Sequence, residues 1–302
     1  MRFSLWLLIL APFAMTCDCD KDIRERIPGF NAAFLEMTDS QRQASIDNHF
    51  LFGLPTLDVP DNEITLVNNH FVTIYDPDLR VPLLAGYRLT DDDIMQAERL
   101  DCFRPDPRLT EEQNATCTDY SEPFFDRGHI VPRADMNRST TAMANTYLFT
   151  NMAPQFGNFN RGIWAKLEGL VREWTQVKGE LYILTGSIFD RGKPGREPDD
   201  KAIRMYSYNH KARVAVPTHF YKILIHRDEN GKLMTQSFLL KHVPDGLINR
   251  EEFALSTLRR SLTTIDKIES MIGMNILPEL EESQATKLES RKLPRLWPLM
   301  FQ

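Results

Sequence analysis

A short segment near the middle of the chain concentrates side chains that can do chemistry. Asp126-Arg127-Gly128-His129 is followed by Ile-Val-Pro-Arg133, so an acid, two cations and an imidazole lie close together. Histidine titrates nearest to neutral pH, and His129 could therefore take a proton from water. The arginines could offset negative charge that develops on a phosphate during hydrolysis of a phosphodiester. On this segment alone, a polar loop with a surface histidine is an equally good interpretation.

A second polar group follows in the segment from Asn151 to Glu168, which also contains Gln155, Asn158 and Asn160. Asn160 and Glu168 are eight residues apart, about 80° around an α-helix and two turns along it, so both can face one cleft. An amide oxygen, a carboxylate and water suit a hard cation such as Mg²⁺. The alternative is that Asn158 or Asn160 only caps the helix, and on this cluster alone that alternative is the better one.

The elements that must position these residues can be predicted from hydrophobic periodicity. An apolar stripe predicts a helix over residues 160–175, and it consists of Ile163, Leu167, Leu170, Val171 and Trp174. Strands are predicted at 64–67, 71–75, 83–89, 181–184, 214–216, 220–225 and 237–240, with the fourth ending at Gly186. Turns are predicted at Asn68-Asn69 and Asn230-Gly231. Helices near 250–257 and 262–272 complete one domain. We expect an α+β fold with a mixed, mostly antiparallel sheet.

Composition and charge restrict the function only weakly. The chain has 302 residues, of which 42% are hydrophobic and 26% are charged, as in ordinary globular proteins. Its formal net charge of −6 argues mildly against a protein that binds nucleic acid over its whole surface. An enzyme needs only a local basic groove, so the charge does not exclude a nucleic-acid substrate.

The N-terminus has the pattern of an export signal. Met1-Arg2 is followed by an apolar run from Phe3 to Met15 that is too short to span a bilayer comfortably. We expect residues 1–17 to be a signal peptide and the mature protein to be secreted or periplasmic. Cys17 stands where a lipoprotein cysteine would, but Ala14-Met15-Thr16 matches a lipobox poorly, so lipid anchoring is the less favoured alternative.

The chain has four cysteines, and an even number in an exported protein suggests disulfide bonds. A Cys102–Cys117 pair would close a polar loop and is the pairing that we favour. Cys17 and Cys19 are separated by one residue, which leaves little room for a bond between them. None of these spacings is that of a zinc finger.

The two polar clusters together resemble a known family. The ordered set of Asp126-Arg-Gly-His129, Asn151-x-x-Pro-Gln155, Asn160 and Glu168 resembles the DNA/RNA non-specific endonucleases of the ββα-metal superfamily, which include Serratia-type nucleases and endonuclease G. The likeness covers about residues 50–275 and extends to five further segments, Phe52-Gly-Leu-Pro55, Tyr75-Asp-Pro77, Leu148–Gln155, Thr185–Phe189 and Val214–Phe220. It implies a ββα-metal catalytic motif within the α+β fold.

The resemblance also implies roles for the catalytic residues and the metal ligand. His129 matches the general base, and Asn160 matches the ligand of one Mg²⁺, for which Mn²⁺ could substitute. Glu168 matches the glutamate that orients metal-bound water, and Arg127 matches an arginine beside the scissile phosphate. Asp126 is expected to be a structural partner that fixes the loop.

Further residues are expected around the substrate. Asn151 and Gln155 match polar groups that line the site, and Arg133 is predicted with them as a substrate-binding residue. The family also has an upstream arginine that stabilises the transition state. We assign it to Arg99, although Arg104 and Arg108 lie in the same divergent loop.

The sequence thus predicts a secreted endonuclease that hydrolyses DNA and RNA and leaves 5′-phosphate ends. Two alternatives are a phosphodiesterase for smaller substrates and a non-catalytic nucleic-acid-binding protein on the same fold. We expect a signal peptide at 1–17, an N-terminal arm at 18–50, the endonuclease domain at 51–278 and a charged, peripheral C-terminal tail at 279–302. We expect no stable membrane span in the mature chain. A homodimer is an expectation from the family.

Overall fold

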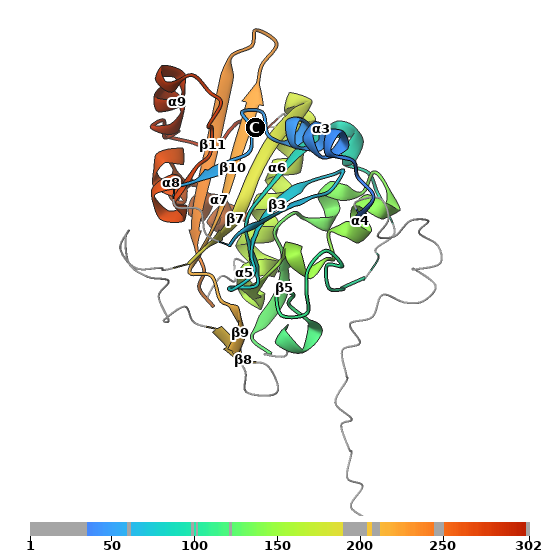
Figure 1. Ribbon diagram of the computed structural model, residues 1–302. Coiled ribbons are helices and arrows are strands. Elements are labelled where there is room, and N and C mark those ends of the chain that lie inside the picture. The colour runs from blue at the N-terminus through green and yellow to red at the C-terminus, as the bar shows by residue number, and fades with distance from the viewer. Residues whose placement is uncertain are drawn as a thin grey trace, which may run out of the picture.

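A seven-stranded antiparallel sheet forms the centre of the computed structural model (Figure 1). The structure describes residues 35–58, 62–97, 100, 102–120, 123–189, 204–206, 212–244 and 251–299. The strand order is β12-β11-β10-β7-β4-β3-β2, and each neighbouring pair is antiparallel. The bounds are β2 Ile64–Val67, β3 Val72–Asp76, β4 Val81–Thr90, β7 Glu180–Ile188, β10 His219–Arg227, β11 Leu233–Lys241 and β12 Leu262–Thr263.

Three two-stranded pairs and the helices surround this sheet. The pairs are β1 (Thr56–Leu57) with β13 (Met274–Asn275), β5 (Phe125–His129) with β6 (Met152–Phe156), and β8 (Arg204–Tyr206) with β9 (Ala212–Ala215). Among the described residues, the helices of at least six residues are α3 Asp39–His49, α4 Thr140–Asn145, α6 Ala165–Lys178, α7 Glu251–Arg260, α8 Ile265–Ile272 and α9 Glu282–Glu289. In Figure 1, α8 and α9 lie on the β11 side of the sheet, and α3 and α4 lie on the opposite side. The predicted α+β class is confirmed.

Most of the predicted strands are present, but the end predicted at Gly186 is wrong, because β7 continues to Ile188. A Cβ atom at Gly186 would lie 1.9 Å from the carbonyl oxygen of Leu83 on β4. The glycine therefore allows β7 to pass close to β4 and does not end the strand.

The predicted apolar stripe packs α6 into the core. All five of its side chains are buried, and they are Ile163, Leu167, Leu170, Val171 and Trp174. Trp174 stacks on Phe238 of β11 with ring centroids 6.1 Å apart. Gly179 ends the helix at φ 79°, a conformation that glycine adopts without strain. The β5–β6 hairpin and this helix form the ββα unit.

The prediction of one continuous helix from residue 160 is wrong at its start. A single π-helical turn, η5 (Asn160–Trp164), lies between the short α5 (Gly157–Phe159) and α6. The N–H group of Ala165 donates to the carbonyl of Asn160, five residues back, and Gly162 has non-helical angles of φ −102° and ψ −106°. The chain therefore kinks at Gly162, and the angle of about 80° expected for Asn160 and Glu168 in an uninterrupted helix does not apply.

Both ends of the described chain pack against the sheet. In the predicted arm, α3 begins with a Thr38 capping box, and the Oγ of Ser45 donates to the carbonyl of Asn68 at 2.6 Å. The segment after residue 278 is not peripheral, since Trp297 is buried and its carbonyl accepts a hydrogen bond from the indole of Trp174 at 3.1 Å. The predicted signal peptide lies outside the described residues. Within the part of the chain that the structure describes, no helix is both long enough and apolar enough to cross a membrane.

Candidate active site

The predicted site residues on β5 point to two opposite faces of the β5–β6 hairpin. Asp126 lies opposite Gln155, and His129 lies opposite Met152. Because side chains alternate along a strand, Asp126 and Gly128 share one face and Arg127 and His129 share the other. The same strand therefore positions both the predicted metal ligand's partner and the predicted base.

The carboxylate of Asp126 orients Asn160. The Nδ2 of Asn160 donates to the Oδ2 of Asp126 at 2.9 Å, and the Nη1 of Arg161 donates to Oδ1 at 3.1 Å. Since Nδ2 is held by a charged acceptor, the amide is fixed with its Oδ1 on the other side. An amide oxygen held in this way is a suitable ligand for a hard cation. The donor chemistry of this structure thus fits Mg²⁺. The sequence predicts that Asp126 fixes its own loop, and in the structure its carboxylate bonds the side chains of Asn160 and Arg161.

His129 and Arg127 lie against aromatic rings. The imidazole of His129 packs edge-on against Tyr147 with centroids 5.0 Å apart and lies 5.9 Å from Phe103. The guanidinium carbon of Arg127 lies 3.9 Å from the centroid of the Phe103 ring, and its Nη1 is 3.7 Å from the sulfur of Cys117. Both residues are half-buried, so packing restricts their rotamers, and the Nε2 of His129 is itself buried. Neither Cys102 nor Cys117 is a free thiol.

A buried set of charges surrounds Glu168. Burial raises the pKa of this carboxyl to about 7, against the attraction of the Lys222 ammonium, while the charge of Asp135 raises it further. Burial also lowers the pKa of Lys222 to about 8, and Glu168 opposes this shift. The Nη1 of Arg172, one turn from Glu168 on α6, donates to Asp135 at 2.8 Å. Each charge in this set has an opposite charge nearby, which buried ions require.

Asn151 is placed differently from the predicted substrate contact. It is fully buried, and its Oδ1 accepts from the N–H of Val131 at 2.9 Å. Its Nδ2 donates to the carbonyls of Val131 and Thr146 at 3.0 and 2.9 Å. The side chain is therefore committed to holding the backbone that follows His129, and its geometry is that of a positioning residue.

Gln155 and Arg133 carry buried polar atoms that the protein leaves unsatisfied. Neither Oε1 nor Nε2 of Gln155 has a hydrogen-bond partner among the described residues, although the side chain is fully buried. Its amide packs over Gly128, where a Cβ atom would lie 2.4 Å away. The Nη1 of Arg133 is likewise buried without a partner within the described protein. Unpaired buried polar atoms are costly, so both side chains are suited to bonding a ligand.

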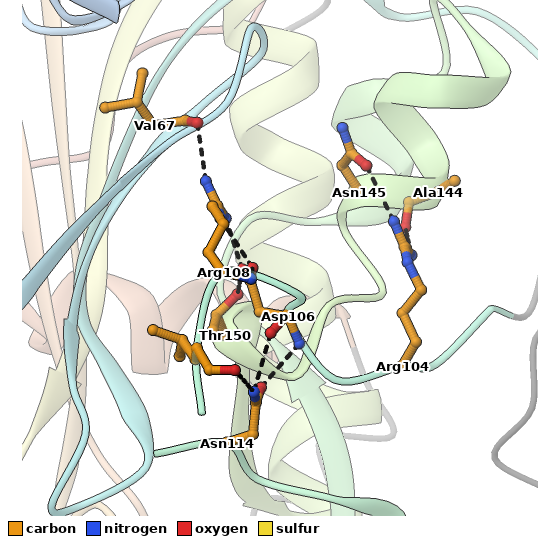
Figure 2. A network of polar contacts seen from close by, with 9 residues as sticks. Val67, Arg104, Asp106, Arg108, Asn114, Ala144, Asn145 and Thr150 are labelled. Carbon is orange, nitrogen blue, oxygen red and sulfur yellow. Dashed lines mark hydrogen bonds and ion pairs between the residues drawn. The ribbon is translucent and has the colours of Figure 1, made fainter. Parts of the chain in front are cut away.

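Two arginines of the divergent loop, Arg104 and Arg108, are held by contacts within the protein (Figure 2). Arg104 donates through Nη1 to the carbonyl of Ala144 at 2.6 Å and through Nη2 to Asn145 at 3.1 Å. Arg108 forms an ion pair of 2.6 Å with Asp106 and also bonds the carbonyl of Val67. Both arginines therefore fix the loop itself. Arg99 lies outside the described residues.

Comparison with known proteins identifies the family. The family model described as DNA/RNA non-specific endonuclease matches residues 52–283. The chain belongs to the DNA/RNA non-specific endonuclease family. Membership makes it a nuclease, a hydrolase that acts on nucleic acids.

Relatives and a solved structure agree with this assignment. The chain is 32% identical to human mitochondrial endonuclease G over 213 residues, which cover 70% of this chain and 68% of the relative. It is 32% identical to nuclease C1 of Cunninghamella echinulata over 72% of this chain and 84% of the relative, and 30% identical to a nuclease of Nostoc sp. over 82% and 86%. A chain in the crystal structure of the EndoG/EndoGI complex superposes with a TM-score of 0.64 at 25% identity, covering 82% of this chain and 96% of that one.

The structure adds residues that the sequence analysis of this endonuclease missed. Lys222 is completely buried in β10, where its Nζ donates to the Oγ1 of Thr185 at 3.1 Å and lies 4.9 Å from the centroid of the Trp164 ring. A single lysine in the apolar run from Phe220 to Ile225 is the signal that could have identified it. Asp135 and Arg172 offer no such signal, because isolated charges are common in loops and on helices.

Proposed function

We propose that the chain is an exported, metal-dependent endonuclease that hydrolyses both DNA and RNA with His129 as the general base. One arrangement carries the proposal. Asp126 fixes the amide of Asn160, and His129 follows three residues later on the same strand, about 10 Å along it. Asp126 and His129 lie on opposite faces of this strand, so it supplies an oriented oxygen ligand on one face and a half-buried imidazole on the other. These are the two kinds of group that metal-assisted activation of water needs.

In the proposed reaction, His129 accepts a proton from the attacking water, and its contacts with Phe103 and Tyr147 hold the imidazole in place. Arg127 offsets charge on the phosphate, and Gln155 and Arg133 bind substrate through their unsatisfied atoms. Asn151 holds the turn after the base. We also keep Arg99 as the upstream cation. Cleavage leaves a 5′-phosphate and a 3′-hydroxyl.

The Oδ1 of Asn160 would hold the metal ion, with Mg²⁺ as the natural ion and Mn²⁺ as a substitute. The bound ion supplies positive charge for the phosphate and for the leaving 3′ oxygen. Glu168 accepts hydrogen bonds from water at this site when it is ionised. Lys222 favours the ionised form by placing a buried cation near the carboxylate.

Export is the second part of the proposal. The apolar run from Phe3 to Met15 and the oxidised state of Cys102 and Cys117 support it, and we propose that these two cysteines pair with each other. N-terminal sequencing of the mature protein tests the cleavage expected near residue 17. A homodimer stays a prediction, to be checked by sedimentation of the mature protein.

The deciding experiment gives the purified protein plasmid DNA, a long RNA and bis-p-nitrophenyl phosphate, each with Mg²⁺ and with EDTA. We expect both polymers to be degraded in Mg²⁺ and spared in EDTA. Cleavage of the small diester alone would favour the phosphodiesterase alternative. Binding of both polymers without cleavage would favour the non-catalytic alternative.

A further inference from the structure

The residue that precedes β5, Phe124, carries an exposed aromatic ring, and β5 is the strand whose Asp126 binds Asn160. Phe124 has the largest exposed fraction, 70%, among the exposed large apolar side chains of the described residues. The next residue, Phe125, packs on Phe156 with centroids 4.7 Å apart, and His242 lies beside both rings. The ring of Phe124, which precedes this aromatic cluster in the chain, is thus largely exposed. Burial of apolar surface is favourable, so this ring can stabilise a ligand that covers it.

An exposed cation, Arg161, lies near the backbone of Phe124. The side chain of Arg161 is 71% exposed, although its Nη1 is held by Asp126 at 3.1 Å. Gly157 connects the two features, since its N–H group donates to the carbonyl of Phe124 at 3.3 Å. A Cβ atom on Gly157 would lie 2.3 Å from the Nη2 of Arg161, so the glycine leaves room for the guanidinium. The guanidinium of Arg161 and the backbone of the residue that carries the exposed ring therefore both lie next to Gly157.

The same carboxylate connects this pair to the candidate metal ligand. Asp126 binds Arg161 through Oδ1 and Asn160 through Oδ2. The guanidinium is thus held at a fixed place next to the amide that would bind the cation. A strand whose scissile phosphate lies at Asn160 would bring an adjacent phosphate and its base to Arg161 and Phe124.

We propose that Phe124 and Arg161 form a nucleotide-binding subsite, in which a base stacks on Phe124 and the neighbouring phosphate pairs with Arg161. The inference rests on the proposed function. Stacking on a protein ring requires a free base face, which unpaired nucleotides offer and paired bases within a duplex do not. The subsite therefore takes single-stranded or locally unpaired DNA and RNA. Sequence preference is not expected, because every base has a π-face.

The test compares KM for a single-stranded oligonucleotide with KM for a hairpin duplex of the same sequence. Phe124→Ala should raise KM for the single strand about 5- to 100-fold and raise KM for the duplex much less, and Phe124→Trp should restore the value. Arg161→Gln should weaken the binding of both substrates. It should also reduce the slope of log affinity against log salt concentration by about one. Val177→Ala and Arg291→Gln are the controls, because they remove an exposed apolar side chain and an exposed cation on other elements.

A binding measurement separates the subsite from the proposed function. The same substitutions are made in the His129→Ala protein, and fluorescence anisotropy gives Kd for the single strand. A protein that cleaves well but shows equal KM and Kd for Phe124→Ala and Val177→Ala would overturn the subsite and leave the nuclease proposal intact. Wild-type protein that binds but never cleaves would contradict the nuclease proposal. Loss of affinity in the Phe124→Ala protein would still support the subsite in that case.

Discussion

Replacement of Asp126 by alanine should weaken the affinity for Mg²⁺, because the amide of Asn160 loses the acceptor that orients it. The bond from Nδ2 to Oδ2 is 2.9 Å long and has a charged acceptor. Such bonds contribute about 1.5–3 kcal/mol, which corresponds to about a 10- to 150-fold change in an equilibrium constant. Loss of the partner that orients a metal ligand typically costs 10- to 100-fold in affinity or activity. The two arguments agree on a 10- to 100-fold loss.

The assay measures initial rates of hairpin cleavage over a series of free Mg²⁺ concentrations. In Asp126→Ala, we expect the half-saturating concentration to rise about 10- to 100-fold. Arg161→Gln removes only the contact with Oδ1 and should change this concentration less than threefold. Circular dichroism and thermal unfolding establish that the variants are folded. A folded Asp126→Ala protein with the wild-type half-saturating concentration would refute the reasoning.

Three further predictions concern the buried charges, the buried imidazole and the C-terminal segment. Lys222→Met removes the cation that opposes the raised pKa of Glu168, so the acid limb of the kcat/KM profile should move up by about one to three pH units. Lys222→Arg should move the acid limb less. An unchanged acid limb in a folded Lys222→Met protein would show that Lys222 does not lower the pKa of the group that controls activity. Burial lowers the pKa of His242 to about 4, so below its ordinary value of 6.5 the unfolded chain binds a proton that the folded chain rejects. Urea unfolding should show that the unfolding free energy of the wild type falls by up to about 3 kcal/mol relative to that of His242→Gln between pH 6.5 and pH 4. The same pH dependence of the unfolding free energy in both proteins would contradict this. Trp297→Ala should reduce the unfolding free energy by about 3–5 kcal/mol, and a loss below 1 kcal/mol would mean that the segment is peripheral after all.

The sequence predicted the parts of the fold that depend on local patterns. Short apolar runs rich in β-branched residues predicted the strands, which are buried along most of their length. The stripe from Ile163 to Trp174 predicted the buried face of α6, because a helix that packs on a core buries residues at this period. The turn at Asn230-Gly231 was also predicted, and Gly231 has the positive φ, 76°, that this turn needs. Gly186 was misread because the close approach of Leu83 comes from a strand about a hundred residues earlier.

The site was predicted less completely because its geometry depends on tertiary contacts. The spacing of Asn160 and Glu168 fixes the angle between them only in an uninterrupted α-helix, and the chain kinks at Gly162 between the two residues. Asn151 has the polarity of a substrate contact, and only the backbone around it shows that its amide is already used. Lys222 acquires its significance from Glu168 on a different element. Residue types indicated the chemistry, and burial decided which side chains remain available for it.

Single-turnover cleavage by His129→Ala tests the proposed mechanism most directly. With a labelled hairpin at saturating Mg²⁺, we expect the cleavage rate to fall at least about 100-fold, as is typical when a general base is removed. Affinity for the same hairpin, measured by anisotropy, should remain within a few-fold of wild type, since the imidazole acts on water and not on the binding of the strand. A His129→Ala protein that binds the hairpin and cleaves it at close to the wild-type rate would contradict the assignment of His129 as the base.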